Sequence, residues 1–328
     1  MIERLLDDPL AMLRSVLLIA MVGCFTWVSG DFLSMGNIYA LGQTFALLGL
    51  VALGLALTMM TGEFDLSVGT MVAVAGLIMV KVGEQNVAAG AICAVGFGAL
   101  LGLVNGVFTL WLGVSSLVTT LGTMILLQGL AVWIEGGEGV TFTHYELTDF
   151  VDTRWLAVLS PRSVVTLLGF VVAGLILRST RLGRDIIAAG SRRKAALMSG
   201  AQVHVAVTAV FVLSGIFSAL AGALLSISLG RAASHFGANL LLQAATAAIL
   251  GGVALSGGVG GPLGIALGVL VLAVLNNGLS LIGAGTPAIL LLNGGVLLCA
   301  VLVDGAPGAW LRERFVRTRT IRHLPPIR

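Results

Sequence analysis

Residues 38–61 read IYALGQTFALLGLVALGLALTMMT and contain no charged side chain. A helix needs about 20 apolar residues to cross a hydrocarbon core of about 30 Å, so this run is long enough to span a membrane. The next segment, TGEFDLSVG at 61–69, carries two carboxylates before the sequence becomes apolar again. Long apolar runs separated by short polar breaks continue along the chain, which indicates several membrane-spanning helices.

The overall composition supports the same fold class. Hydrophobic residues make up 58% of the 328 residues and charged residues only 10%, whereas soluble domains carry about 25% charged residues. The 45 glycines are about twice the usual share, and small residues let membrane helices approach one another closely. The composition predicts an all-α membrane protein and excludes a soluble fold.

Turn and break signals divide residues 1–328, a single transmembrane domain, into a bundle of about ten spans. They are predicted at 15–29, 38–61, 67–80, 88–111, 115–134, 162–178, 204–227, 239–256, 262–282 and 287–303. Ser160-Pro161 is typical of a helix start, because proline is well accommodated in the first turn. Within 38–80, the break at 62–65 is interpreted either as a loop or as an interruption inside the membrane.

The charges follow the positive-inside rule if both termini are cytoplasmic. The predicted inner segments are 179–203, with Arg181, Arg184, Arg192, Arg193 and Lys194, and 304–328, with Arg312, Arg314, Arg317, Arg319, Arg322 and Arg328. The predicted outer segment 135–160 carries Glu135, Glu138, Glu146, Asp149 and Asp152. We expect the basic tail at 304–328 to anchor the last span against anionic membrane lipid rather than to bind a specific partner, and we expect no nucleic acid among the partners.

A short internal similarity suggests a possible inverted repeat. GLVNG at 102–106 resembles AVLNNG at 273–278, and the predicted spans that carry them run in opposite directions. Inverted repeats are common in transporters and place the substrate path at the repeat interface. The match is short, and chance similarity is the alternative interpretation.

The sequence lacks the motifs of an enzyme. A P-loop needs the pattern GxxxxGK[ST], and the only lysines, Lys81 and Lys194, do not stand in it. No HExxH is present, and no two of the four histidines have metal-ligand spacing. We therefore expect no catalytic residue, cofactor or metal on this chain, and any ATP and Mg²⁺ to be bound by a partner ATPase.

Two polar segments have both a structural and a functional interpretation. Asp65 could cap the helix that follows it, or act with Glu63 in a transport path or gate. The amphipathic segment 179–203 could be a solvated loop that only sets topology. It could also form a small helix that docks into a separate ATPase and transmits its closure.

Several blocks together resemble the ribose-type permeases of bacterial ABC importers, a group that also contains branched-chain amino-acid permeases. The blocks are DLSVG at 65–69, VNG at 104–106, TTLGT at 119–123, LGR at 182–184 with AG, AA and SG at 189–190, 195–196 and 199–200, AAILGGVALSGGVG at 247–260, and VLNNGL at 274–279. They occur in family order over residues 40–303. Two departures are Gly62-Glu63, where the family usually has two glycines, and Val259, where it usually has arginine.

The resemblance implies a multi-pass protein of the bacterial inner membrane that takes up a sugar or a sugar-like solute. Its implied partners are a second permease copy or sister permease, ABC ATPase subunits and a periplasmic sugar-binding protein. It also implies that 179–203 is the cytoplasmic coupling loop, whose ATPase-coupling residues would be Leu182, Gly183, Arg184, Asp185, Ala189, Gly190, Ser199 and Gly200.

Transport would proceed by alternating access along a sparsely polar path. The candidate path and gate residues are Glu63, Asp65, Ser67, Gln43, Asn105, Thr119, Thr120, Thr123, Gln128, Gln243, Asn276 and Asn277. A polar side chain of this kind more often forms a hydrogen bond between helices than a contact with a ligand. The glycine-rich stretch 251–264 is interpreted as a tight helix break near the path, or alternatively as simple close packing. The alternative function is an ATP-independent facilitator or ion-coupled carrier, which would need a charge relay inside the membrane, and only Glu63 and Asp65 are available for one.

Overall fold

The structure, a computed structural model, describes residues 9–137, 139–155 and 157–304. The helices in this part are α2 (Pro9–Val28), α3 (Met35–Met60), α4 (Val68–Gly83), α5 (Val87–Leu110), α6 (Ser116–Glu135), α7 (Tyr145–Val151), α8 (Pro161–Ser179), α9 (Arg181–Ser191), α10 (Arg193–Met198), α11 (Val203–Leu229), α12 (Leu240–Leu250), α13 (Pro262–Leu281) and α14 (Thr286–Asp304). Two short antiparallel strands, β1 (Val140–Thr141) and β2 (Arg231–Ala232), pair with each other.

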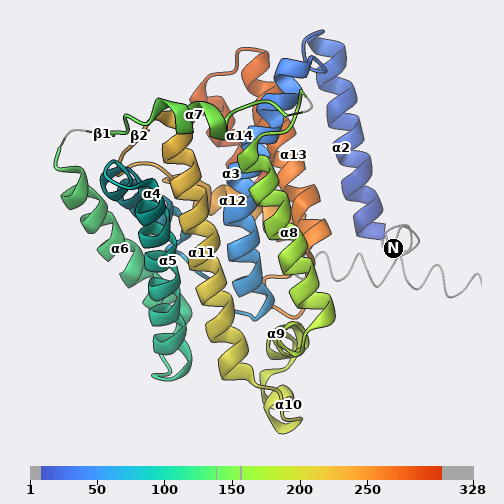
Figure 1. Cartoon of the computed structure of the whole chain (residues 1–328). Coiled ribbons are helices and arrows are strands. Elements are labelled where there is room, and N and C mark those ends of the chain that lie inside the picture. The colour runs from blue at the N-terminus through green and yellow to red at the C-terminus, as the bar shows by residue number, and fades with distance from the viewer. Residues whose placement is uncertain (1–8, 138, 156, 305–328) are drawn as a thin grey trace, which may run out of the picture.

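The long helices form one bundle in which α11 packs against α3, α4 and α5 (Figure 1). Six helices, α3, α5, α6, α8, α11 and α13, are long and apolar enough to cross a membrane. Shorter apolar helices occupy the other predicted spans, in α2, α4, α12 and α14. The prediction of an all-α, polytopic membrane protein is confirmed.

The predicted span at 239–256 is wrong in its extent. Its helix, α12, has only 11 residues, or about 16 Å at 1.5 Å per residue, too short to cross a bilayer alone. Three glycines that follow it have left-handed backbone angles, with φ of 83° at Gly252, 85° at Gly257 and 76° at Gly258. This conformation is readily open to glycine alone, so the chain leaves the helix and forms an irregular segment at 251–261, which we call the glycine segment.

The break between α3 and α4 is largely buried, although Gly62 is exposed and Glu63 and Phe64 are half-buried. Residues 61–67, the α3–α4 break, include Thr61 at 1%, Asp65 at 2% and Ser67 at 2% exposure. Gly62 turns the chain with φ of 79°. Of the two interpretations of this break, the structure therefore favours an interruption in the interior over a surface loop.

Glycines bring α5 and α11 together, as the composition predicted. A Cβ on Gly98 would lie 2.6 Å from the Cβ of Ala219, and one on Gly106 would lie 2.8 Å from the Cα of Thr208. Larger residues at these α5 positions would force the two helices apart. The core around α11 therefore depends on close backbone contact rather than on large interlocking side chains.

The two long connections lie at opposite ends of the bundle (Figure 1). The connection from α6 to α8 contains β1 and α7, and the connection from α8 to α11 contains α9 and α10. Figure 1 shows α9 nearly end-on while α8 and α11 extend lengthwise, so α9 crosses the direction of the bundle helices. Of the two interpretations of 179–203, this arrangement agrees with the small helix; its docking into an ATPase stays a prediction.

Candidate functional site

The α9 helix is amphipathic and starts at a side-chain cap. The Thr180 hydroxyl oxygen accepts a hydrogen bond from the Gly183 N–H at 3.1 Å, which satisfies one of the free donors of the first turn. Ile186 and Ala189 are buried against the bundle, whereas Arg184 is exposed. The helix therefore holds an apolar face on the protein and presents cationic side chains outward.

Two of the predicted coupling residues fasten α9 to the neighbouring helices. A Cβ on Gly183 would collide with the backbone of Ile176 and Leu177 in α8, so glycine permits their close approach. The Asp185 carboxylate accepts a hydrogen bond from the Gln202 N–H at 3.3 Å. It also lies 3.8 Å from the Arg181 guanidinium. Asp185 thus holds α9 to the start of α11 instead of facing outward.

The α10 helix presents the more exposed part of the same connection. Leu197 is 45% and Met198 90% exposed, and Lys194 is exposed beside them. The chain then turns at Gly200, whose φ is 80°, and the Ser199 hydroxyl donates to the Ala196 carbonyl at 2.8 Å. An exposed surface that is both apolar and cationic is suited to binding another protein.

At its C-terminal end, α9 touches the last residue of α3, just before the α3–α4 break, and the glycine segment. The Gly258 N–H donates to the Met60 carbonyl at 2.9 Å. A Cβ on Gly190 would collide with both of those groups. A Cβ on Gly257 would lie 2.9 Å from the Cα of Gly62. Three segments distant in sequence therefore meet backbone to backbone at this place, which we call the glycine junction.

An ion pair joins the same break to α10. Nη2 of Arg193 lies 2.5 Å from a carboxylate oxygen of Glu63, and the two side chains are 40% and 10% exposed. Nη2 also donates to the Thr61 carbonyl at 3.4 Å. The predicted gate residue Glu63 thus binds the predicted coupling segment.

Three of the predicted path residues come together around a fourth, Asp65. The two oxygens of its carboxylate accept hydrogen bonds from the hydroxyls of Ser67 at 2.6 Å and Ser214 at 2.8 Å. The Asn105 amide donates to the Ser67 hydroxyl at 3.2 Å and accepts from the Thr123 hydroxyl at 2.6 Å. We call these five residues the Asp65 cluster; it links the break to α5, α6 and α11.

A second set of hydrogen bonds ties the break to α6. The Thr120 hydroxyl donates to the Phe64 carbonyl at 3.2 Å and accepts from the Leu66 N–H at 3.1 Å. The Ser116 hydroxyl accepts from the Phe64 N–H at 3.4 Å. Buried backbone groups need such partners when they leave a helix, so these side chains stabilise the interruption.

The predicted capping role of Asp65 is only partly right. Helix α4 starts at Val68 after the cap residue Ser67, whose side chain makes no capping hydrogen bond. The Asp65 carboxylate accepts from the Ser67 N–H at 3.0 Å, one residue before the helix. Asp65 thus closes the turn that leads into α4 and does not bond the first-turn N–H groups.

The structure does not bring the remaining path candidates into the Asp65 cluster. Asn277 exchanges two hydrogen bonds with Asn37, at 2.8 and 2.9 Å, where α13 ends beside the start of α3. Thr119 and Asn276 each have a buried side-chain oxygen without a partner among the described residues. Gln243 is partly buried on α12, and Gln128 is exposed on α6.

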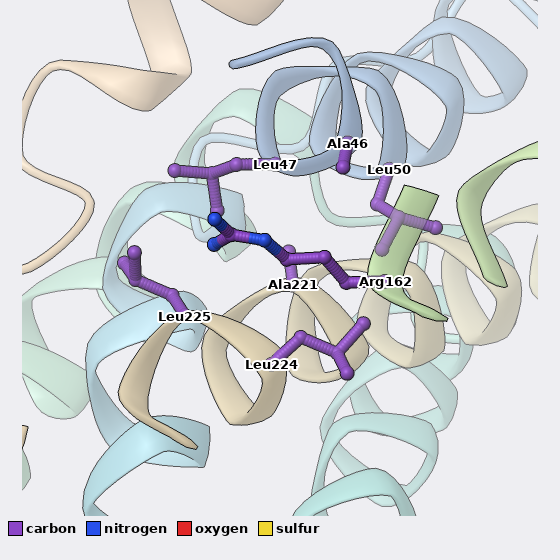
Figure 2. A pocket seen from close by; sticks show the side chains of 7 residues that line it. All are labelled: Ala46, Leu47, Leu50, Arg162, Ala221, Leu224 and Leu225. Carbon is purple, nitrogen blue, oxygen red and sulfur yellow. The ribbon is translucent and has the colours of Figure 1, made fainter. Parts of the chain in front are cut away.

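Gln43 belongs to a polar group at the end of the bundle opposite α9. Its side-chain oxygen accepts hydrogen bonds from Ser160, at 3.1 Å, and from Nε of Arg162. The same Nε lies 3.1 Å from the Asp152 carboxylate. Figure 2 shows the Arg162 guanidinium pointing into a small pocket lined by Ala46, Leu47, Leu50, Ala221, Leu224 and Leu225.

Sequence reasoning missed Arg162. The signal was an arginine directly after Pro161, at the start of an apolar run and beside an otherwise acidic connection. A charge at that position is costly unless a partner neutralises it, which should have suggested pairing with one of the acidic residues of 135–160.

The described residues contain no group of three or more His, Cys, Asp or Glu side chains that could hold a metal ion. The cysteines at 24, 93 and 299 are free and exposed.

The model of the family described as branched-chain amino acid transport system/permease component matches residues 37–301. The chain belongs to this family. It is 33% identical over 276 residues to the L-arabinose ABC transporter permease protein AraH of Azospirillum brasilense, covering 84% of this chain and 81% of the relative. It is 35% identical over 279 residues to the ribose import permease protein RbsC of Bacillus subtilis, covering 84% and 86%.

A further relative is the ribose import permease protein RbsC of Escherichia coli K12, at 31% identity over 88% of this chain and 92% of the relative. No solved structure matches the chain. The protein is therefore a permease component, the membrane-spanning and non-catalytic part of a transport system. The resemblance seen in the sequence motifs is confirmed.

Proposed function

We propose that this permease belongs to a bacterial ABC importer and carries a sugar across the inner membrane. Its relatives bear the names of arabinose and ribose permeases, and one, at 28% identity, is named the D-allose transport system permease protein AlsC. These sugars share hydroxyl-rich surfaces, which sparse polar groups in a path can bind weakly and release. The substrate is an aldose of this kind.

The observation that carries the proposal is the position of α9 and α10. They project from one end of the bundle (Figure 1) and expose Arg184 and Met198. At the same time Gly190 lies against Met60 at the end of α3, and Arg193 is paired with Glu63 in the α3–α4 break. A loop that only set topology would not need contacts with an interior break. This arrangement supports the interpretation of α9 and α10 as a coupling element that a partner ATPase binds and moves.

The partners of this permease follow from the roles of the two ends of the bundle. ATPase subunits, which bind ATP and Mg²⁺, dock on the α9–α10 end in the cytoplasm. A periplasmic binding protein delivers the sugar at the opposite end, which carries α7. A second permease, either a copy of this chain or a sister chain, completes the path, and alternating access arises as the two permeases move against each other.

The finer topology belongs to the same proposal: ten spans with both termini in the cytoplasm. Residues 305–328, most of the basic tail, and Glu138 fall outside the described residues. The inverted repeat is supported by helix direction. The start of α5 follows Glu84, which bonds Thr143 near α7, and the end of α13 bonds Asn37 near the same end. The helices that carry 102–106 and 273–278 therefore run in opposite directions.

The alternative, an ATP-independent facilitator or ion-coupled carrier, has weaker support. Its charge relay would need Glu63 and Asp65, but Glu63 is paired with Arg193. Asp65 is held by two serine hydroxyls. Neither carboxylate is poised to pass an ion along the bundle.

The test is mild-detergent purification from native membranes, with mass spectrometry of the proteins that co-purify. We expect an ATPase with a P-loop in equal number with the permease chains. Proteoliposomes of this complex, with the co-encoded binding protein, should take up L-arabinose, D-ribose or D-allose only with ATP. A chain that purifies alone and passes these sugars without ATP would support the facilitator and contradict the importer.

A further inference from the structure

Glu63 and Arg193 are 130 residues apart in the sequence, yet they join the interior break to the exposed coupling element. We propose that this ion pair is a positioning contact that carries the displacement of α10 to the Asp65 cluster. The proposal rests on the proposed function, because it needs an ATPase that moves α9 and α10. It gives a role to the glutamate that departs from the family pattern.

The low exposure of the Glu63 carboxylate explains why the pair stays closed during such a movement, although the Arg193 side chain is 40% exposed. The Glu63 side chain is only 10% exposed, and a buried carboxylate that loses its partner is strongly destabilised. The Arg193 guanidinium also donates to the Thr61 carbonyl, so it holds the backbone of the break as well as the carboxylate. Moving α10 away would therefore draw residues 61–63 with it.

Because Glu63 and Asp65 are only two residues apart in the chain, a displacement of Glu63 also moves Asp65 and its cluster. Two residues of extended chain span at most about 7 Å, so the break has little slack. Asp65 is bonded to Ser67 and Ser214, and Ser67 is bonded to Asn105. A shift of Glu63 must stretch or rearrange these bonds, which reach α5 and α11.

The glycine junction offers a second contact between the coupling element and the break, but of a different kind. At Gly190 the backbones only touch, which can push α3 but cannot pull it. The ion pair can pull. The two contacts together allow α9 and α10 to move the break in both directions, as alternating access requires.

Neighbouring cations provide the matched control. Lys194 is exposed, and no ion pair to it is found among the described residues, in contrast to Arg193. Glu63→Gln removes the pair while keeping side-chain size, and Arg193→Gln removes it from the other side with a shorter neutral side chain. The double variant Glu63→Arg with Arg193→Glu restores it with the charges exchanged, and Lys194→Gln removes an adjacent charge without touching the pair.

The experiment is hydrogen–deuterium exchange of the permease–ATPase complex, with and without trapping by ATP and vanadate. In the wild type we expect trapping to change exchange both at 181–198 and at 61–67. In the Glu63→Gln variant the change at 181–198 should persist, while that at 61–67 should fall on the order of tenfold, as expected for the loss of a charged hydrogen bond. The exchanged-charge variant should recover it, and Lys194→Gln should behave like the wild type.

A wild-type response at 61–67 in the Glu63→Gln variant would overturn the inference while leaving the importer intact. No change at 181–198 in the wild type would instead contradict docking on α9 and α10, and hence the proposed function. If Glu63→Gln fails to accumulate, the exchanged-charge variant decides. If the exchanged-charge variant accumulates and shows the exchange response at 61–67, the inference is supported. If it accumulates but lacks that response, the inference is refuted.

A second control distinguishes a loss of transmission from α10 to the break from a general loss of protein stability. Asn86→Ala removes the cap of α5, whose side chain accepts from the Ala89 N–H at 3.0 Å, far from the glycine junction. If this variant also lost the response at 61–67, the effect of Glu63→Gln would reflect general destabilisation, and the inference would be overturned.

Discussion

Replacing Gly190 by alanine has two opposing effects on the stability of the protein. Gly190 lies inside α9, and alanine favours a helix over glycine by about 1 kcal/mol. However, the added methyl group would collide with the Met60 carbonyl and the Gly258 N–H. Both are backbone groups that cannot turn aside as a flexible side chain could.

The collision should outweigh the gain in helix propensity. Overpacking a tight interior costs about 1–3 kcal/mol, and the hydrogen bond from Gly258 to Met60, now 2.9 Å long, would weaken at a further cost of about 1 kcal/mol. We therefore expect a net loss of about 1–3 kcal/mol, confined to the contact of α9 with the break. The helix itself should remain formed.

The matched control is Gly129→Ala in α6, where an added Cβ would meet nothing within 4 Å. We expect Gly129→Ala to be neutral or stabilising and Gly190→Ala to lower the thermal midpoint in detergent. In the reconstituted complex, Gly190→Ala should also reduce sugar-stimulated ATPase activity. A Gly190→Ala variant as stable and as well coupled as Gly129→Ala would refute the close backbone contact at the glycine junction.

Three further predictions concern other parts of the protein. Arg184→Glu should leave membrane insertion intact, because the side chain is exposed, yet abolish transport-coupled ATPase activity; normal coupling would contradict its role at the ATPase interface. Asp65→Asn should lower the free energy of unfolding by about 1–3 kcal/mol, as a thermal scan would measure. The amide nitrogen of the asparagine cannot accept a hydrogen bond and therefore leaves one serine hydroxyl without an acceptor. Hydrogen bonds from Thr143 hold the pKa of Glu84 below its ordinary value. The stability from this contact is therefore complete at neutral pH and lost as pH falls through the lowered pKa. Glu84→Gln should flatten the acid side of a plot of thermal midpoint against pH, and an unchanged acid side would refute this assignment.

The membrane fold could be predicted from the sequence because hydropathy acts locally. Any run of about 20 apolar residues must become a helix in lipid, since each backbone polar group needs an internal partner there. Helices therefore appear in all ten predicted ranges, and the motif blocks identified the family. The span predicted at 239–256 runs past the end of α12, although the glycine-rich stretch 251–264 was interpreted as a helix break. An apolar run alone does not reveal at which residue glycines turn the backbone out of the helix.

The functional site could be predicted only in part. The motif blocks pointed to Asp65, Ser67, Asn105 and Thr123 individually, and the structure joins them in one cluster. Ser214, the remaining member, lies in a long apolar run where nothing in the sequence marks one serine above another. Arg162 could have been predicted as a paired residue, because it is a charged side chain at the start of an apolar helix.

By itself, the sequence determined that this is a helical membrane permease, which ranges of the chain contain its long helices, and which amphipathic connection stands apart from them. Only the tertiary structure decided that Glu63 pairs with Arg193 and that Gly190 lies against Met60. Hydropathy, charge and turn signals act over a few neighbouring residues. An ion pair across 130 residues depends instead on how α3, α9 and α10 pack, and packing of that kind leaves no periodic trace in the chain.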